Sequence, residues 1–292
     1  MEEKNKRNDI LRLAVCGIVA VLWFAFGLFD VPKQGGAALL SFFFAIAFSV
    51  KFFLELRKYW RNRGKNRREV LPMNLNTTGL FDLSHSLAGD YLARFEYPWQ
   101  ALDGIKDLIL ALGPALGQDY QERQPQVWVH KTAQIAPTAF LGAPCIIGPD
   151  TEVRHCAFIR GSALVGANCV VGNSVELKNV ILFDKVQTPH YNYVGDSILG
   201  YQSHMGAGSI TSNIKSDKTL VTVKDGNRLL ETGRKKFGAI LGDCVEVGCN
   251  SVLNPGTVVG PRTNIYPLSC VRGAVPGDSI YKTGGVTVKK EK

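Results

Sequence analysis

The 292-residue sequence contains seven cysteines but no C-x-x-C pair, and it has only five histidines. Zinc ribbons depend on paired cysteines, and an odd number of cysteines cannot all be bridged within one chain. The spacing therefore argues against a disulfide framework and a zinc site, and it favours a reducing compartment. The hydrophobic content of 46% also excludes a disordered or collagen-like chain.

The basic surplus is confined to the first quarter of the chain. The whole sequence carries 34 Lys and Arg against 25 Asp and Glu, but residues 1–72 alone hold 13 basic and 6 acidic side chains. The rest of the chain is close to neutral. Since a nucleic-acid-binding domain needs a basic stripe on its folded part, no nucleic-acid partner is expected.

The same quarter contains two long apolar runs. Residues 13–29 carry no charge, and residues 37–54 are interrupted only by Lys51. Each run approaches the roughly 20 residues that a helix needs to cross a bilayer. Basic residues flank both outer ends, which predicts that residues 10–56 form a transmembrane helical hairpin in the cytoplasmic membrane, with the rest of the chain facing the cytoplasm. Buried helices of a soluble protein are the alternative, and a cleaved signal peptide is disfavoured because no small-residue cleavage site follows the first run.

The segment that follows the second run is strongly basic. Residues 57–68 have two interpretations that do not exclude each other, a topology signal with a solvated linker and a contact with anionic lipid. Met73 is a candidate internal start for a soluble form, because everything before it differs in composition.

From residue 135 onward an aliphatic residue recurs at every sixth position, and a small or β-branched residue follows four positions after it. The aliphatic residues are Ile135, Leu141, Ile147, Val153, Ile159, Val165, Val171 and Leu177, and then Leu241, Val247, Leu253, Val259, Ile265 and Val271. A period of six returns one side chain to the interior on each face of a triangular prism, so three hexapeptides form a coil of roughly 18 residues. Small residues fit the corners, where glycine relieves backbone crowding. A β-sandwich would instead show a period of two.

Two segments, 183–193 and 213–238, lose the repeat and are predicted to project from the stack as loops. The second contains Asp225-Gly226 between two strand-like segments, which predicts a β-hairpin. Upstream, one helix is expected over residues 80–95 and another from Pro98 to Leu112, where Gly113-Pro114 stops it, followed by a polar linker over 118–127.

The chain is thus expected to have four parts. They are a membrane anchor with its basic segment over 1–72, a short helical segment and linker over 73–127, a β-helix domain over 128–285, and a basic tail over 286–292.

Three stretches resemble a known family. They are residues 188–200 (TPHYNYVGDSILG), 205–213 (MGAGSITSN) and 233–242 (GRKKFGAILG). They look like the acetyltransferase half of bifunctional N-acetylglucosamine-1-phosphate uridylyltransferases and their archaeal sugar-1-phosphate relatives, which are hexapeptide-repeat transferases. The resemblance implies an all-β fold, a left-handed parallel β-helix. It also implies a homotrimer with active sites between chains, and acetyl transfer from acetyl-CoA, as co-substrate, to a sugar phosphate or nucleotide sugar.

The resemblance also implies roles for single residues. His190 aligns with the histidine that removes a proton from the acceptor amine, and an imidazole with an ordinary pKa of about 6.5 suits that task. Backbone N–H groups near 206–208 are expected to stabilise the oxyanion. Arg160 and Lys178 match phosphate-binding residues. The other implied substrate contacts are Tyr193, His204 and Asn213, with His204 standing where the family has Asn, and the implied acetyl-CoA contacts are Gly206, Ala207 and Cys249.

Other interpretations stay open at this stage. The residues Arg234, Lys235 and Lys236 either bind phosphate or keep a loop soluble. A nucleotidyltransferase needs a glycine-rich phosphate loop with Arg and Lys after its first strand, and residues 1–127 contain none, so that activity is not expected. The third alternative is a non-catalytic scaffold that binds a sugar nucleotide.

Overall fold

The computed structural model describes residues 46–47, 49–57 and 73–291. The chain divides into two compact units, Met1–Val70 and Leu71–Lys292. The described residues of the first unit are helical. None of the helices within the described ranges has the length and apolar character that a membrane crossing requires. The first predicted membrane helix, and most of the second, lie outside the described residues.

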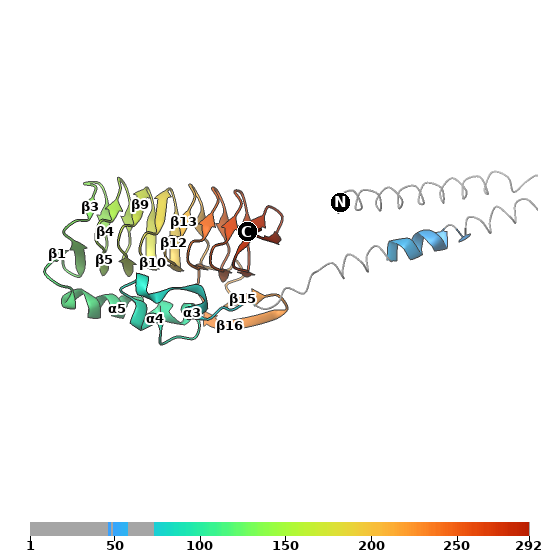
Figure 1. Cartoon of the computed structure of the whole chain (residues 1–292), viewed down its shortest axis with the longest axis horizontal. Coiled ribbons are helices and arrows are strands. Elements are labelled where there is room, and N and C mark those ends of the chain that lie inside the picture. The colour runs from blue at the N-terminus through green and yellow to red at the C-terminus, as the bar shows by residue number, and fades with distance from the viewer. Residues whose placement is uncertain (1–45, 48, 58–72, 292) are drawn as a thin grey trace, which may run out of the picture. The chain divides into compact units, whose positions relative to one another are not determined.

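The second unit is a parallel β-helix. Each short strand pairs in parallel with the strand one coil later: Phe140 pairs with Phe158, and Cys145 with Ala163. Equivalent positions in successive coils are 18 residues apart, as for the hydrogen bond between Thr151 and Cys169. Figure 1 shows the coils stacked along one axis. The fold predicted from the hexapeptide repeat, mostly β with stacked parallel coils, is confirmed.

The strands form three faces. The first face contains β2 (Val127–His130), β5 (Cys145–Ile147), β8 (Ala163–Val165), β17 (Ala239–Leu241), β20 (Thr257–Val259) and β23 (Ala274–Val275). The second face contains β4 (Phe140–Leu141), β7 (Phe158–Ile159), β14 (Ile210–Thr211), β19 (Val252–Leu253) and β22 (Cys270–Val271). The third face contains β3 (Gln134–Ile135), β6 (Glu152–Val153), β9 (Val170–Asn173), β11 (Gln187–His190), β13 (His204–Met205), β18 (Glu246–Val247), β21 (Asn264–Ile265) and β24 (Ser279–Lys282). Two longer strands, β10 (Glu176–Leu182) and β12 (Tyr193–Leu199), bend at a corner and contribute to both the second and the first face.

Single residues with positive φ make the corners. Asp150, Asn168 and Asn250 each have φ of 54°, a conformation that Asp and Asn tolerate better than most residues. The residue after each corner is small and points inward; Thr151 and Cys169 are examples, and both are buried. The small positions of the repeat therefore fill the corners of the prism.

Some of the glycines that follow an inward aliphatic residue are required by the stacking of the coils. A Cβ atom added at Gly172 would lie 1.6 Å from the carbonyl oxygen of Pro189 in the next coil. At Gly148 it would lie 2.4 Å from the carbonyl oxygen of Gly166. Any side chain at these positions would push neighbouring coils apart.

The prediction that residues 183–193 project as a loop is wrong. Residues 187–190 form β11, which pairs in parallel with β9 and β13 within the third face. The repeat is lost because the coils here are one residue shorter, so that Val180 pairs with Ala163 and Ser197 with Val180. A deletion of one residue shifts the six-residue pattern without breaking the wall.

The second interruption is a true insertion. Strands β15 (Val221–Asp225) and β16 (Arg228–Arg234) form an antiparallel hairpin whose turn is Gly226-Asn227. Because of it, the Ala239 N–H donates to the Ser197 hydroxyl across a separation of 42 residues instead of 18. The predicted hairpin is confirmed.

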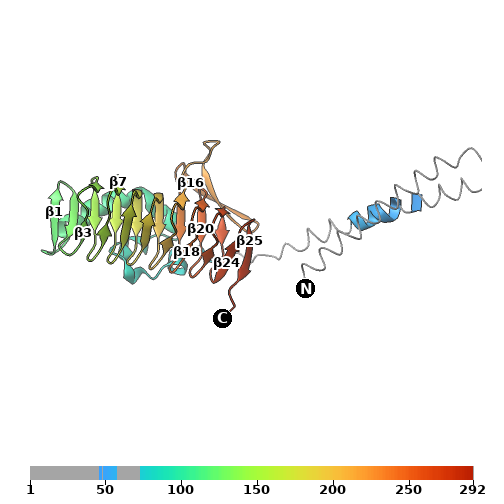
Figure 2. The same cartoon turned by 90° about the horizontal axis from the view of Figure 1, so that it is seen from above.

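Short helices cover the first face. Its outward residues are apolar and fully buried, for example Ile146, Leu164 and Ile181. The helices α3, α4 and α5 and the hairpin lie along one side of the stack in Figure 1, and Figure 2, turned by 90°, shows the hairpin strand β16 projecting beyond the coils. The covering elements are α3 (Thr77–Leu80), η1 (Leu83–His85), α4 (Gly89–Leu92), η2 (Pro98–Gly104), α5 (Ile105–Leu112) and η3 (Gly113–Ala115).

Two expectations for this segment need correction. The helix predicted over 80–95 is broken into short pieces, because the side chains of Asp82 and Ser86 accept hydrogen bonds from backbone N–H groups two residues later. The expected linker over 118–127 contains β1 (Tyr120–Gln124), antiparallel to β2. The helical segment that starts at Pro98 is confirmed. At the far end of the stack, β25 (Val286–Lys289) pairs antiparallel with β24.

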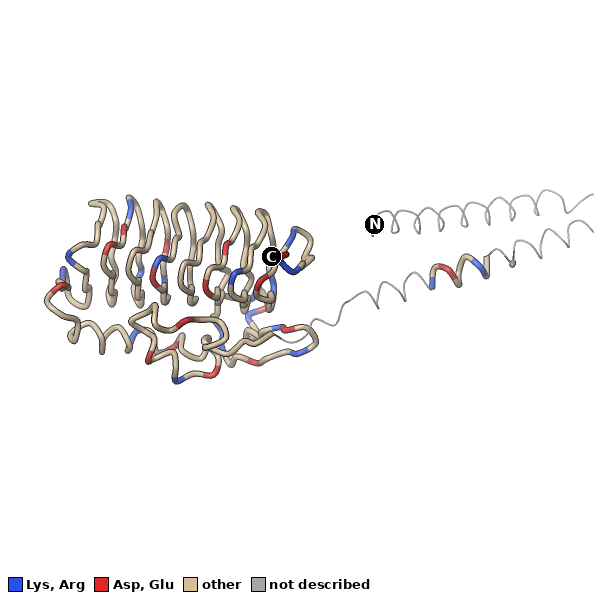
Figure 3. Tube along the Cα trace, viewed as in Figure 1, with Lys and Arg blue, Asp and Glu red and all other residues tan. Residues whose placement is uncertain are grey.

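Charged residues of both signs occur along the second unit. In the view of Figure 3, basic and acidic residues are interspersed along the coils and the helical segment.

Candidate active site

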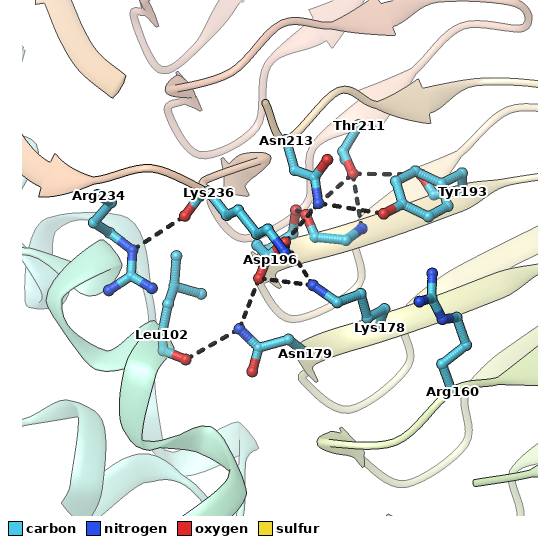
Figure 4. Close-up of polar contacts among 12 residues, drawn as sticks. Leu102, Arg160, Lys178, Asn179, Tyr193, Asp196, Thr211, Asn213, Arg234 and Lys236 are labelled. Carbon is cyan, nitrogen blue, oxygen red and sulfur yellow. Dashed lines mark hydrogen bonds and ion pairs between the residues drawn. The ribbon is translucent and has the colours of Figure 1, made fainter. Parts of the chain in front are cut away.

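A buried carboxylate organises a polar group at the corner between the second and first faces. Asp196 is 4% exposed and has φ of 48°. Its carboxylate accepts hydrogen bonds from Lys178 Nζ at 3.2 Å, Asn179 Nδ2 at 3.0 Å and Asn213 Nδ2 at 2.5 Å (Figure 4). Asn213 Nδ2 also lies 3.3 Å from the Tyr193 hydroxyl. We call these five residues the Asp196 group.

The repeat itself brings this group together. Asn179 and Asp196, each with positive φ, turn the same corner in successive coils, and Lys178, which precedes Asn179, pairs with Gly195. Arg160 stands one coil earlier, and its Nη1 donates to Glu176 Oε1 at 2.8 Å. Burial raises the pKa of the Tyr193 hydroxyl, and the neighbouring carboxylates of Asp196 and Glu176 raise it further. The phenol therefore stays a neutral hydrogen-bonding group at physiological pH.

A pocket of about 330 Å³ adjoins the Asp196 group on the side of the hairpin. Its lining residues are Leu102, Asp103, Asn179, Asp196, Gly233, Arg234, Lys235 and Lys236. The Arg234 side chain is only 9% exposed and binds Asp103 through two hydrogen bonds, at 2.7 and 2.6 Å. Asn179 also donates to the carbonyl oxygen of Leu102 at 3.1 Å, so helix η2 forms one wall of this pocket.

The base of the hairpin thus has two different kinds of cation. Arg234 is held in an ion pair with the helical segment, which is a structural role. Lys235 and Lys236 are exposed and make no ion pair with any residue that the structure describes. Of the three basic residues that the sequence singled out, these two are therefore available to an anion.

The predicted base, His190, lies at the end of β11 on the third face, with an exposed side chain. The backbone N–H of His190 donates to Asn192 Oδ1 at 3.2 Å, and the backbone carbonyl oxygen of His190 accepts from the Gly208 N–H at 3.0 Å. Asn192 is buried and donates to the carbonyl oxygen of Gly206 at 2.9 Å. The backbone that carries the imidazole is therefore fixed to the turn that contains the predicted acetyl-CoA contacts.

Those predicted contacts are adjacent to one another. A Cβ atom on Gly206 would lie 2.7 Å from the Cys249 nitrogen in the next coil, and the Asn250 N–H donates to the carbonyl oxygen of Ala207 at 2.9 Å. Gly206, Ala207 and Cys249 thus line one short stretch of the stack.

The expectation that several N–H groups here face an oxyanion needs correction. The Gly206 N–H already donates to Val247 at 2.7 Å, and the Gly208 N–H donates to His190. Within the described ranges, Ala207 is the residue of this turn whose N–H makes no hydrogen bond. One backbone donor is therefore available for an oxyanion, not three.

The structure does not bring all the predicted residues into one group. His204 lies on β13, and its Nδ1 is 2.8 Å from Glu246 Oε2 in the next coil of the third face. Among the described residues, no hydrogen bond or ion pair joins His190 or His204 to the Asp196 group. In one chain, the phosphate candidates and the base occupy different faces.

Comparisons with known proteins match the same part of the chain. The model of the GMPPB C-terminal domain matches residues 144–267. A bifunctional sugar-1-phosphate nucleotidylyltransferase/acetyltransferase from Sulfurisphaera tokodaii is 26% identical over 189 residues, which cover 63% of this chain and 47% of that protein. The bifunctional protein GlmU of Methanocaldococcus jannaschii is 33% identical over 118 residues, covering 40% of this chain and 28% of that protein. The resemblance to hexapeptide-repeat transferases is confirmed.

The chain spans less than half the length of either curated relative. Among solved structures, the acetyltransferase domain of PglB from Neisseria gonorrhoeae aligns with 65% of this chain and 67% of its own, at 12% identity and a TM-score of 0.29.

No role was predicted from the sequence for Asp196 or for Asn192, although each lies at the centre of one of the hydrogen-bond networks described above. Asp196 lies within the Tyr-x-Gly-Asp stretch, and that stretch is the signal that would have found it, because the repeat is one residue shorter here and pairs Lys178 with Gly195. Asn192 carries a weaker signal, since it stands at a small corner position of the repeat, where a buried amide is unusual. Asn179 could not be found in this way, because its partner Leu102 is 77 residues away.

Proposed function

We propose that the chain is an acyltransferase that moves the acetyl group of acetyl-CoA to an amino or hydroxyl group of a phosphorylated or nucleotide-linked sugar. The observation that supports this most strongly is the Asp196 group, which gathers Lys178, Tyr193 and Asn213 around one buried carboxylate. Three residues that the resemblance assigns to substrate binding are thereby held in fixed positions. The similarity to nucleotidylyltransferase/acetyltransferase proteins points to the same chemistry.

In the proposed reaction, the nitrogen of the acceptor amine attacks the thioester carbonyl carbon of acetyl-CoA, and His190 accepts a proton from that amine. The carbon–sulfur bond breaks, CoA leaves as a thiolate, and the proton on the imidazole passes to that sulfur. The exposed side chain of His190 is open to a ligand. The N–H of Ala207, which has no acceptor within the described part of the chain, stabilises the oxyanion.

The acceptor binds through its phosphate and its hydroxyl groups. Arg160 uses one nitrogen for Glu176 and keeps its other N–H donors for phosphate, a match that guanidinium geometry favours. Lys178 is held beside it by Asp196. Tyr193 and Asn213 present a hydroxyl and an amide to the sugar, and His204 is placed on the third face with the acetyl-CoA contacts.

We propose a homotrimer of left-handed prisms as the active form. Within one chain the helical segment covers the first face, while the second and third faces carry the phosphate candidates and the base. Threefold packing would place the third face of one copy against the second face of the next, and would complete the site. The hand and the trimer both come from the resemblance to the family.

We also propose that residues 10–56 hold the chain at the cytoplasmic membrane, with the β-helix on the cytoplasmic side. The support is the pair of apolar runs and their basic flanks in the sequence. Extraction of membranes with alkaline carbonate tests this. Retention in the pellet is expected, and release of the full chain into the supernatant would refute the anchor.

Acetyl transfer is tested with the purified full chain, acetyl-CoA, and either glucosamine 1-phosphate or a UDP-linked amino sugar, with the product identified by mass spectrometry. An acetylated product is expected, and His190→Ala should lower the rate by about a hundredfold or more. His130→Ala is the matched control, because the His130 ring contacts Tyr120 and Thr132, neither of which is assigned to the site. A wild-type chain that acetylates none of these acceptors, or a fully active His190→Ala variant, contradicts the proposal.

The same preparation separates the rival functions. Pyrophosphate release from UTP or dTTP with sugar 1-phosphates would favour a nucleotidyltransferase and is not expected. Saturable binding of a UDP-linked sugar without turnover would favour a scaffold.

A further inference from the structure

Two phenylalanines lie side by side and exposed on the second face, next to Arg160. Phe140 is 57% exposed and Phe158 43%, and their ring centroids are 5.5 Å apart. Both side chains point outward, while the following residues, Leu141 and Ile159, point into the core. Because much of each ring stays in water, these two side chains contribute less stability than buried phenylalanines would.

We propose that Phe140 and Phe158 form a platform on which the base of a nucleotide stacks, so that the acceptor is a nucleoside diphosphate sugar rather than a free sugar phosphate. This inference rests on the proposed function, because it takes the Asp196 group as the place where the sugar binds.

The register of the second face places the platform in line with that group. Phe158 pairs with Glu176, and Glu176 pairs with Tyr193, so the platform and the phenol are two strand spacings apart. Neighbouring strands are about 4.8 Å apart, which puts Phe158 roughly 10 Å from Tyr193. A ribose and two phosphates can bridge that distance between a stacked base and a sugar.

Positive charge lies where the two phosphates would be. Arg160 follows Phe158 by two residues on the same face, and only its Nη1 is engaged, by Glu176. Lys178 lies one coil further along, and Lys236 lies on the hairpin side of Asp196 (Figure 4). The Arg160–Glu176 pair and the Lys178–Asp196 pair are each neutral overall. The net positive charge on this side of the molecule therefore comes from Lys235 and Lys236, which line the pocket beside Asp196.

The combination of rings and cations selects this ligand class. A sugar 1-phosphate has charge but no aromatic ring, and it would leave the phenylalanines without a partner. A nucleoside diphosphate has both, and stacking on an aromatic side chain accepts any base. In the proposed trimer a neighbouring copy also faces this surface, and a nucleotide held between the two copies accounts both for the rings and for the cations beside them.

Binding of UDP, GDP and inorganic pyrophosphate to the purified full chain, measured by calorimetry, tests the platform. Phe158→Leu keeps an apolar side chain but loses the ring, and it should weaken UDP and GDP by roughly tenfold to a hundredfold while leaving pyrophosphate unchanged. Phe158→Trp restores a ring and should bind both nucleotides at least as well as the wild type. Leu268→Ser, at an exposed apolar residue of a distant coil, should change nothing.

Two outcomes would overturn the inference. One is equal nucleotide affinity in the wild type and Phe158→Leu. The other is a change of oligomeric state in Phe158→Leu, measured by light scattering, which would assign the rings to an interface between copies. Acetylation of glucosamine 1-phosphate by the same preparations is measured in parallel. If that activity is present while the platform fails, the proposed function stands and only the nucleotide is wrong.

Discussion

Replacing Asp196 by Asn should unfold the corner of the prism that the polar group holds together. The carboxylate is 4% exposed and accepts hydrogen bonds from three side chains, those of Lys178, Asn179 and Asn213. An asparagine keeps one oxygen but turns an NH₂ group toward a donor, and it leaves the partly buried ammonium of Lys178 without its counter-charge. Breaking a buried pair from one side typically costs 3–5 kcal/mol. Because Lys178 retains some contact with water, we expect a loss of about 3 kcal/mol.

Thermal unfolding of the full chain measures this loss. For a domain of this size, about 3 kcal/mol corresponds to a decrease in Tm of roughly 6–12 °C. Glu176→Gln is the matched control, because it removes an ion pair with Arg160 whose side chains are 45% and 32% exposed. Exposed pairs contribute at most about 1 kcal/mol, so this variant should stay within about 3 °C of the wild type. If Asp196→Asn lowers Tm no more than Glu176→Gln does, the Asp196 carboxylate does not organise the site.

Two further predictions concern the stack itself. Gly172→Ala should lower the free energy of unfolding by about 2 kcal/mol or more, because the new Cβ would lie 1.6 Å from the Pro189 carbonyl oxygen. The control Gly117→Ala, at a position with open space around it, should be neutral. Equal stabilities of the two variants would show that the stacked coils do not require glycine at position 172. Burial raises the pKa of the thiols of Cys145 and Cys169 to about 12, so in iodoacetamide labelling at pH 8, read by mass spectrometry, both should stay unmodified until the chain is denatured, whereas the exposed Cys156 should react. Rapid labelling of Cys145 in the native chain would show that the corner is open.

The sequence predicted the wall of the prism well, because its rule is local. One aliphatic residue per six is the number that a triangular coil needs, and Val153, Val171 and Ile265 are buried as that rule requires. The rule failed at residues 183–193, where coils one residue shorter shift the pattern although the strand pairing continues. The six-residue pattern of aliphatic residues is lost in the same way whether one residue is deleted from a coil or a loop projects from it, so the pattern cannot distinguish the two cases.

The candidate site was only partly predictable. Lys178 and Tyr193 were found through the resemblance, and the structure places both in the Asp196 group. Their arrangement depends on side chains that meet across coils, and on the helical segment, where Asn179 reaches Leu102. Such side-chain contacts leave no periodic pattern in the sequence. The oxyanion donors were overestimated for a similar reason, because the N–H of Gly206 is used by the neighbouring coil.

The most direct test of the central claim is an experimental structure of the full chain with CoA bound. The account predicts that the pantetheine arm follows the stack past Gly206, Ala207 and Cys249, and that its sulfur ends beside the imidazole of His190 with the Asp196 group of a neighbouring copy facing it. A CoA molecule bound elsewhere, or a sulfur atom remote from every His190, would contradict the assignment of this β-helix as an acyltransferase.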